Sequence, residues 1–132
     1  QKTYLTPHPG EAAKLLNSSV TDVESDRIKS IHELKNKYDG QWLLKGSGSL
    51  ILENEKLWMC TAGNAGMGTG GMGDVLSGMI ASLKAQLNEQ IALHEIVTLH
   101  ALAGDELAKE GMRGLQAFDM PKVVYKMINA QM

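Results

Sequence analysis

The sequence of 132 residues predicts an α/β fold in a single domain. Two patterns predict the fold class, and the chain length predicts the number of domains. Short apolar runs at 42–44, 50–52 and 57–60 are typical of buried strands. Segments with apolar residues at helical spacing lie both before and after these runs. A chain of this length has room for one core but not for two full domains, so residues 1–132 are expected to form a single domain.

The first expected helix follows the irregular segment 6–11, whose prolines fix the backbone and remove hydrogen-bond donors. Pro9 can occupy the first turn of a helix, and Glu11 is favourable there because helix N-termini carry partial positive charge. The helix is expected to continue through 12–16.

A second helix is expected to begin at a capping box formed by Thr21 and Glu24. Gly40 is a typical C-terminal cap for it. Beyond it, 42–44 is expected to be a buried strand. The runs 50–52 and 57–60 form a hairpin at the sheet edge, with Cys60 packed in the core.

Glycines concentrate in the second half of the chain, where seven of the 14 lie between Gly63 and Gly78. Three helices are expected after them, with His100 as a core histidine and the third helix starting near 119–121. The expected apolar positions of the first two are Val75, Leu76, Met79, Ile80 and Leu83, and Leu93, Ile96, Val97, Ala101 and Leu107. About three strands would leave the sheet uncovered, which indicates part of a larger sheet.

Composition argues against several classes of partner. The net charge is -2 and the pI about 6.1, so neither a nucleic-acid nor a membrane partner is expected. No stretch approaches the ~20 apolar residues of a membrane span. One cysteine excludes an internal disulfide and favours a cytoplasmic location. No residue spacing resembles a fixed metal site.

The glycine-rich segment from Gly63 to Asp74 predicts a phosphate site. Glycines allow backbone N–H groups to converge on one point, and the start of the following helix adds unpaired N–H groups. The segment is neither a Walker A loop nor a Rossmann fingerprint, because the required lysine and glycine spacing are missing. Asp74, at the start of the helix, is suited either to capping or to acting as a general base.

Four segments, taken in order, resemble the NAD(P)H-hydrate dehydratases of the ribokinase superfamily. The resemblance implies a ribokinase-like three-layer α/β/α sandwich, of which this chain would be the C-terminal portion. The segments are Thr6-Pro7-His8-Pro9-Gly10-Glu11, Leu43-Leu44-Lys45-Gly46-Ser47-Gly48-Ser49, Asn64 through Gly78, and Leu99-His100-Ala101-Leu102-Ala103-Gly104-Asp105.

The resemblance implies a repair reaction in which hydrated NADH or NADPH is dehydrated to the normal cofactor. ADP or ATP, accompanied by Mg²⁺, is consumed to AMP or ADP and phosphate. The hydrate hydroxyl is phosphorylated and the phosphate is then eliminated. The reaction therefore has two small-molecule partners, an adenine nucleotide and an NAD(P)H hydrate.

The resemblance also assigns roles to residues. His8 and Asp74 would bind the hydrate, with Asp74 as the catalytic base. The adenine nucleotide would lie against Lys45, Gly46, Ser47, Gly48, Ser49, Gly71 and Gly73. The anion hole would be formed by Gly71, Met72 and Gly73. The chain departs from the family pattern in having Ala65, Gly68 and Met72 where proline, alanine and threonine are usual, and Met72 is expected to affect nucleotide affinity.

Two alternative functions remain open. One is a ribokinase-like kinase acting on a vitamin-precursor alcohol, and the other is a non-catalytic ADP-binding partial domain. Members of the fold are about twice this length, so we expect an N-terminal half or a homo-oligomer to complete the sheet. We expect little activity from this polypeptide alone.

Overall fold

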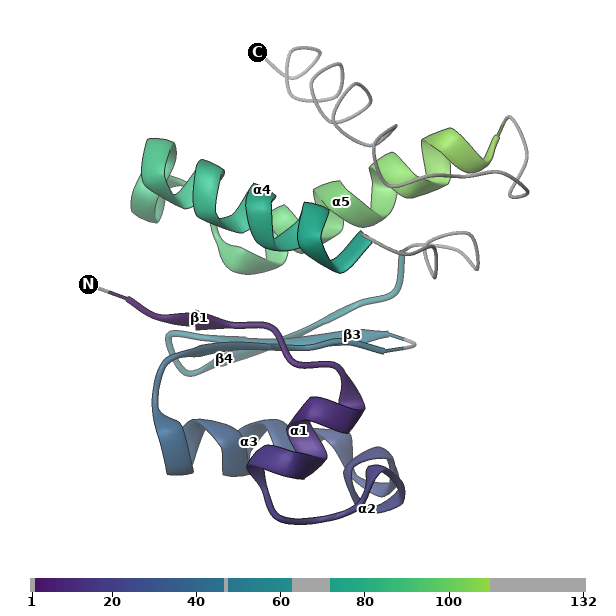
Figure 1. Cartoon of the computed structure of the whole chain (residues 1–132). Coiled ribbons are helices and arrows are strands. Elements are labelled where there is room, and N and C mark those ends of the chain that lie inside the picture. The colour runs from purple at the N-terminus through teal and green to yellow at the C-terminus, as the bar shows by residue number, and fades with distance from the viewer. Residues whose placement is uncertain (1, 47, 63–71, 110–132) are drawn as a thin grey trace. The chain divides into compact units, whose positions relative to one another are not determined.

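The computed structural model describes residues 2–46, 48–62 and 72–109. The chain divides into two compact units, Gln1–Thr61 and Ala62–Met132, and each is described here by itself (Figure 1). In the described residues, no helix combines the length and apolar character needed to cross a membrane.

The first unit is built on a four-stranded mixed sheet in the order β1-β2-β3-β4. The strands are β1 (Tyr4–Leu5), β2 (Gln41–Leu44), β3 (Ser49–Glu53) and β4 (Lys56–Cys60). Strand β1 pairs in parallel with β2, and β2, β3 and β4 pair in antiparallel fashion. The three predicted strands and the hairpin at the sheet edge are confirmed. Strand β1 was missed because only two residues pair.

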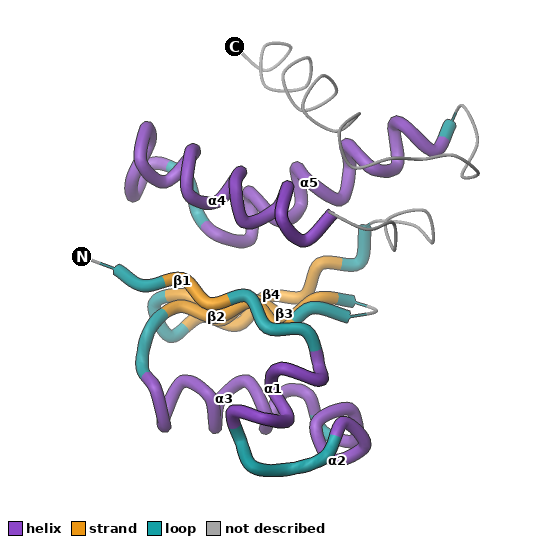
Figure 2. The backbone as a smooth tube through the Cα atoms, in the orientation of Figure 1, coloured by secondary structure: helices purple, strands orange, loops and turns teal. Residues whose placement is uncertain are grey.

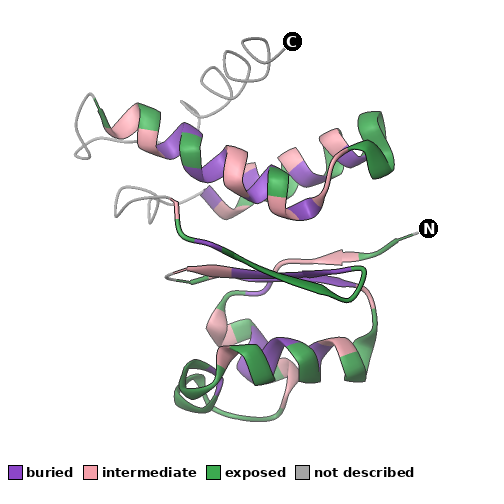
Figure 3. Ribbon diagram, turned by 180° about the vertical axis from the view of Figure 1, so that it is seen from behind, coloured by how far each residue is buried: buried purple, intermediate pink, exposed green. Residues whose placement is uncertain are grey.

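Three helices lie on one face of this sheet: α1 (Pro9–Leu15), α2 (Val20–Ser25) and α3 (Arg27–Tyr38) (Figure 2). The buried residues of α3, namely Ser30, Ile31 and Leu34, recur at helical spacing on one side of the helix, as an amphipathic helix on a sheet requires (Figure 3). Alternate strand residues pack against the helices because successive side chains of a strand point to opposite faces. The core contains Ala12, Ala13, Val23, Ile31, Leu34, Trp42, Leu44, Leu50 and Leu52.

The predicted capping box at Thr21 and Glu24 is wrong. Helix α2 begins after Ser19, whose hydroxyl accepts a hydrogen bond from the Asp22 N–H at 3.0 Å. The single helix expected here is divided, because Asp26 adopts an extended conformation and its carboxylate caps Lys29 N–H at 3.0 Å. Several Ser, Thr and Asp residues in this segment could cap a helix, and the two that do so are Ser19 and Asp26 rather than the predicted Thr21.

Hydrogen bonds close the edge of the sheet where β1 and β2 begin. Lys35 Nζ lies 2.8 Å from the Asp39 carboxylate and 3.8 Å from that of Glu55. The Gln41 side chain accepts a hydrogen bond from Asn54 N–H at 2.8 Å, and Lys2 Nζ donates to the Asn54 side chain at 2.9 Å. This edge therefore joins the end of α3 to the β3–β4 turn.

The second unit contains α4 (Met72–Leu87), the short 3-10 helix η2 (Asn88–Gln90) and α5 (Leu93–Ala108). Helix α4 buries every fourth residue, which is one stripe of a helix surface: Met72, Leu76, Ile80 and Lys84. Most of the predicted apolar face of α5 is buried, namely Leu93, Ile96, Val97, His100 and Ala101. The third predicted helix lies outside the described residues.

His100 connects the two helices of this unit. Its residue exposure is 7%, and its imidazole hydrogen-bonds the backbone of Met72, at the start of α4. Burial lowers the pKa of His100 to about 4, and the hydrogen bond to Met72 opposes that shift only in part. Within the described residues its Nε2 has no hydrogen-bond partner. His100 is thus a core histidine, as predicted, and it is tied to the turn that carries Asp74.

We predict that His100 makes folding sensitive to mildly acidic pH. Its pKa is about 4 in the folded chain and 6.5 in the reference state, so the unfolded chain takes up the proton first. Stability should therefore fall as pH is lowered from 6.5 towards 4, by up to about 1.4 kcal/mol per pH unit from this group.

Chemical denaturation of His100→Gln across that pH range tests the prediction. The stability difference between wild type and variant should shrink as pH falls, because only the wild type carries the buried imidazole. His32→Gln, at an exposed position, is the control and should keep the wild-type slope. Equal slopes for wild type and His100→Gln would contradict the assignment.

Candidate functional site

The sheet of the first unit brings two of the predicted site segments to the end of the sheet where β1 and β2 terminate, called here the carboxyl edge. The segment 6–11 follows β1 and the segment 45–49 follows β2. Since β1 and β2 are parallel, their carboxyl ends lie side by side. The Lys45 N–H donates to the Pro7 carbonyl at 3.0 Å, which joins the two segments directly. Ligands of open α/β sheets bind at this carboxyl edge.

The glycine-rich segment also leaves from this edge. Strand β4 ends at Cys60, which lies opposite Ser49, the first residue of β3. A side chain at Gly48 would lie 3.6 Å from the Met59 sulfur, so the end of β4 is close to the loop after β2. The chain therefore enters the glycine-rich segment next to the other two. Residues 63–71 lie outside the described residues.

His8 is the N-cap of α1, a role that the sequence analysis did not assign. Its Nδ1 accepts a hydrogen bond from Glu11 N–H at 3.1 Å, and the Glu11 carboxylate accepts one from His8 N–H at 3.0 Å. The pair is a capping box with histidine in the place of serine or threonine. Gly10 leaves room for the ring, because a Cβ there would lie 3.0 Å from His8 Cε1.

This arrangement fixes the tautomer of His8. Because Nδ1 accepts, the proton of the neutral ring is on Nε2, which lies 3.4 Å from the Glu11 carboxylate. The His8 side chain is 58% exposed, so an N–H donor is presented at the surface. The hydrogen bond from His8 N–H lowers the pKa of Glu11, and the charges of Lys45 and Lys14 act in the same direction.

Lys45 is the cation of this edge. It is half-buried directly after β2, and its charge helps to lower the pKa of Glu11. Among the described residues, this edge carries the Lys45 ammonium group, the His8 imidazole and the Glu11 carboxylate beside the exposed Gly46. In the described residues no three His, Cys, Asp or Glu side chains form a metal-binding group.

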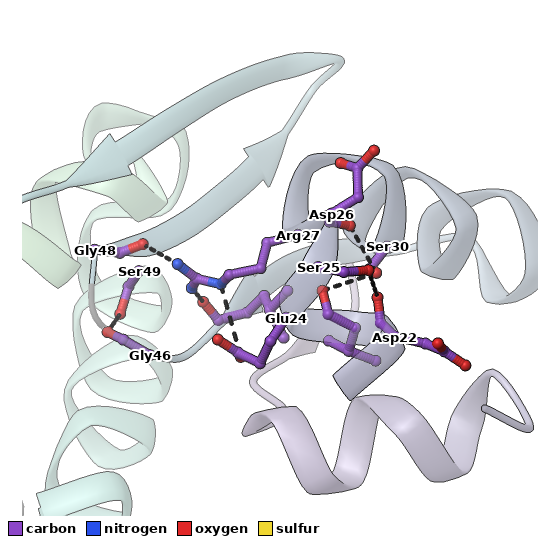
Figure 4. Close-up of polar contacts among 11 residues, drawn as sticks. Asp22, Glu24, Ser25, Asp26, Arg27, Ser30, Gly46, Gly48 and Ser49 are labelled. Carbon is purple, nitrogen blue, oxygen red and sulfur yellow. Dashed lines mark hydrogen bonds and ion pairs between the residues drawn. The ribbon is translucent and has the colours of Figure 1, made fainter. Parts of the chain in front are cut away.

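The loop after β2 depends on Arg27, which the sequence analysis missed. The guanidinium donates to the carbonyl oxygens of Gly48 at 2.9 Å and Leu44 at 3.2 Å (Figure 4). Arg27 is one of only two arginines in the chain, at positions 27 and 113. The sequence signal for this role is an arginine at the start of a helix, but the sequence does not indicate which loop the arginine contacts.

Asp74 lies in the first turn of α4 and is exposed. The partial positive charge of a helix N-terminus stabilises a carboxylate there. The Met72 side chain is buried at 4% exposure. Its thioether therefore packs in the core of the second unit, and the expected effect of Met72 on nucleotide affinity stays a prediction. Ser47 and Gly71 lie outside the described residues.

The chain matches the family model of the NAD(P)H-hydrate dehydratases over residues 1–126. It is 50% identical over 119 residues to a bifunctional NAD(P)H-hydrate repair enzyme of Coxiella burnetii, covering 88% of this chain and 24% of the relative. It is 42% identical over 130 residues to the corresponding Escherichia coli enzyme, covering 96% and 25%. The chain thus spans about a quarter of the length of these curated relatives.

Solved structures agree with this match. The ADP/ATP-dependent NAD(P)H-hydrate dehydratase of Bacillus subtilis, co-crystallised with ATP and Mg²⁺ and soaked with CoA, aligns with a TM-score of 0.88 and 25% identity. The alignment covers 98% of this chain and 49% of that one. A ribokinase-like protein of Enterococcus faecalis aligns with a TM-score of 0.81 and 30% identity, covering 96% and 44%. The predicted ribokinase-like α/β class is confirmed, and the chain belongs to the NAD(P)H-hydrate dehydratase family.

Proposed function

We propose that this chain is the nucleotide-binding half of an enzyme that uses ADP or ATP to dehydrate NAD(P)H hydrate back to NAD(P)H. One observation carries the proposal beyond family membership. The parallel pairing of β1 and β2 gathers His8, Lys45 and Gly46 at one sheet edge, and the chain enters the glycine-rich segment from the same edge. The curated relatives are named as repair enzymes for this hydrate.

In this proposal the loop after β2 contacts the nucleotide. Lys45, with Gly46, Ser47, Gly48 and Ser49, lies against ADP or ATP, and Mg²⁺ accompanies the phosphates. The backbone N–H groups of Gly71, Met72 and Gly73 are assigned to the anion hole, which stabilises the charge that builds up on the transferred phosphoryl group. The buried Met72 side chain is consistent with a contribution from backbone alone.

Phosphorylation of the hydrate requires two groups from the protein: a base for the hydrate hydroxyl and a hydrogen-bond donor that orients the hydrate. Asp74 accepts the proton of the hydrate hydroxyl as the hydroxyl oxygen attacks the terminal phosphorus of the nucleotide, and AMP (from ADP) or ADP (from ATP) leaves. The carbon–oxygen bond to the new phosphate then breaks with loss of a proton from the neighbouring ring atom, which releases phosphate and restores the ring double bond. We assign the orienting role to the Nε2–H of His8, because Nδ1 already accepts the capping hydrogen bond from Glu11 N–H. The segment that precedes this region in the homologues would complete the sheet and the substrate pocket.

We predict that Asp74→Asn lowers turnover about a hundredfold or more, because general-base catalysis contributes that much, while ADP affinity stays within a few-fold. The assay is recovery of NADH absorbance from NADH hydrate with Mg²⁺ and ADP or ATP, in a chain extended by the segment that precedes it in the homologues. Asp22→Asn, which removes a carboxylate from the first turn of α2, is the control. A stable phosphorylated alcohol as product would instead identify a kinase.

We predict that two substitutions separate the two roles of His8. Asparagine caps helices well, so His8→Asn should keep the melting temperature, whereas His8→Ala should lose about 1 kcal/mol of stability. If the imidazole also binds substrate, both variants should raise the KM for the hydrate and leave the Kd of ADP unchanged. A wild-type KM in His8→Asn would reduce His8 to a helix cap.

A further inference from the structure

Arg27 occupies an unusual position for a charged side chain. It is the first residue of α3, next to the capping residue Asp26, and its side chain is only 15% exposed. The guanidinium leaves the helix and extends to the β2–β3 loop, defined here as residues 45–48 (Figure 4). A buried guanidinium requires hydrogen-bond partners, because its desolvation is costly.

The partners of Arg27 lie at the two ends of the β2–β3 loop. Nη1 donates to the Gly48 carbonyl at 2.9 Å and Nη2 to the Leu44 carbonyl at 3.2 Å. The Glu24 carboxylate lies 4.0 Å from Nε and orients the group from behind. A guanidinium is planar and rigid, so these bonds fix the distance between the last residue of β2 and the residue before β3.

The glycine at position 46 is explained by the same contact. A Cβ on Gly46 would lie 2.9 Å from Arg27 Nη2, and the residue has φ +155. Any larger residue would push the guanidinium away from the loop. The Gly46 carbonyl is itself turned towards Ser49, whose hydroxyl lies 3.4 Å from it.

The direction of these carbonyl groups matters for an anionic ligand. Carbonyl oxygens carry partial negative charge and repel phosphate, whereas backbone N–H groups attract it. The Leu44 and Gly48 oxygens are held by Arg27 in partly buried hydrogen bonds, so these two repulsive groups are turned towards the guanidinium. Both terminal nitrogens of Arg27 donate to backbone carbonyls at the ends of the loop, so Arg27 can act on a ligand through the conformation of the loop.

We propose that Arg27 is a positioning residue for the adenine nucleotide: it holds the β2–β3 loop in the conformation that binds ADP or ATP. The inference rests on the proposed function, which makes this loop part of the nucleotide site. It adds a residue from α3, outside the four family segments, and gives a reason for the glycine at position 46.

The test compares Arg27→Met and Arg27→Lys with Ser30→Ala in the full chain. Ser30 is buried, and its hydroxyl donates to the Asp26 carbonyl at 2.9 Å and to that of Val23 at 3.3 Å. Its loss weakens the same α2–α3 junction without touching the loop, which makes it the control for destabilisation. Melting temperature, Kd for Mg²⁺-ADP by calorimetry, and nucleotide-free amide exchange over 44–50 are measured for each protein.

Arg27→Met should weaken ADP binding by about tenfold or more, because the loop must be ordered at the moment of binding, and should speed amide exchange over 44–50. Arg27→Lys keeps the charge but replaces the planar guanidinium by one ammonium group, which cannot reach both carbonyl groups in the same way. Its Kd for ADP should therefore lie nearer to that of Arg27→Met than to that of the wild type. Ser30→Ala should lower the melting temperature and keep the wild-type Kd.

Three results would overturn the proposal: wild-type Kd in Arg27→Met, equal weakening in Ser30→Ala, or unchanged loop exchange in Arg27→Met. Failure of the wild-type chain to bind ADP, with faster loop exchange in Arg27→Met, would count against the proposed function and leave Arg27 as the residue that orders the loop.

Discussion

The parallel pairing of β1 with β2 determines where every described site residue of the first unit can lie. Only two residues of β1 pair, yet they set the direction in which the chain leaves the sheet. The same register directs His8 and Lys45 to one edge, and the antiparallel β3–β4 hairpin returns the chain to that edge at Cys60. The opposite edge is closed by Lys2, Gln41, Lys35 and their partners, whereas the proposed ligand site lies at the carboxyl edge.

Helix starts supply the local order at this edge. The capping box of α1 fixes the His8 ring and its tautomer, and the first residue of α3 provides the guanidinium that spans the β2–β3 loop. In the second unit, His100 contacts the backbone at the start of α4, one turn of helix that also carries Asp74. Glu11, Arg27 and His100 thus support residues of the proposed site, and the proposed chemistry uses none of these three side chains.

Sequence patterns predicted most of this fold because its elements obey simple periodicities. The apolar runs of β2, β3 and β4 and the buried stripe of α5 lie where spacing predicted them. The patterns failed where several residues compete for one role: Ser19 and Asp26, not Thr21, cap the helices before β2. Motif order assigned His8, Lys45 and Asp74 to the proposed site, and these assignments stay predictions. The role of Arg27 could not be predicted, because its contacts to Leu44 and Gly48 span 17 and 21 residues.

Amide chemical shifts during titration with Mg²⁺-ADP would test the central claim most directly, since they report each backbone group separately. The account predicts that the largest changes fall at the carboxyl edge, at Lys45, Gly46, Gly48 and Ser49, while Gln41 and Asn54 at the closed edge stay unchanged. Changes centred on the closed edge, or saturation of binding with no change in the β2–β3 loop, would contradict it.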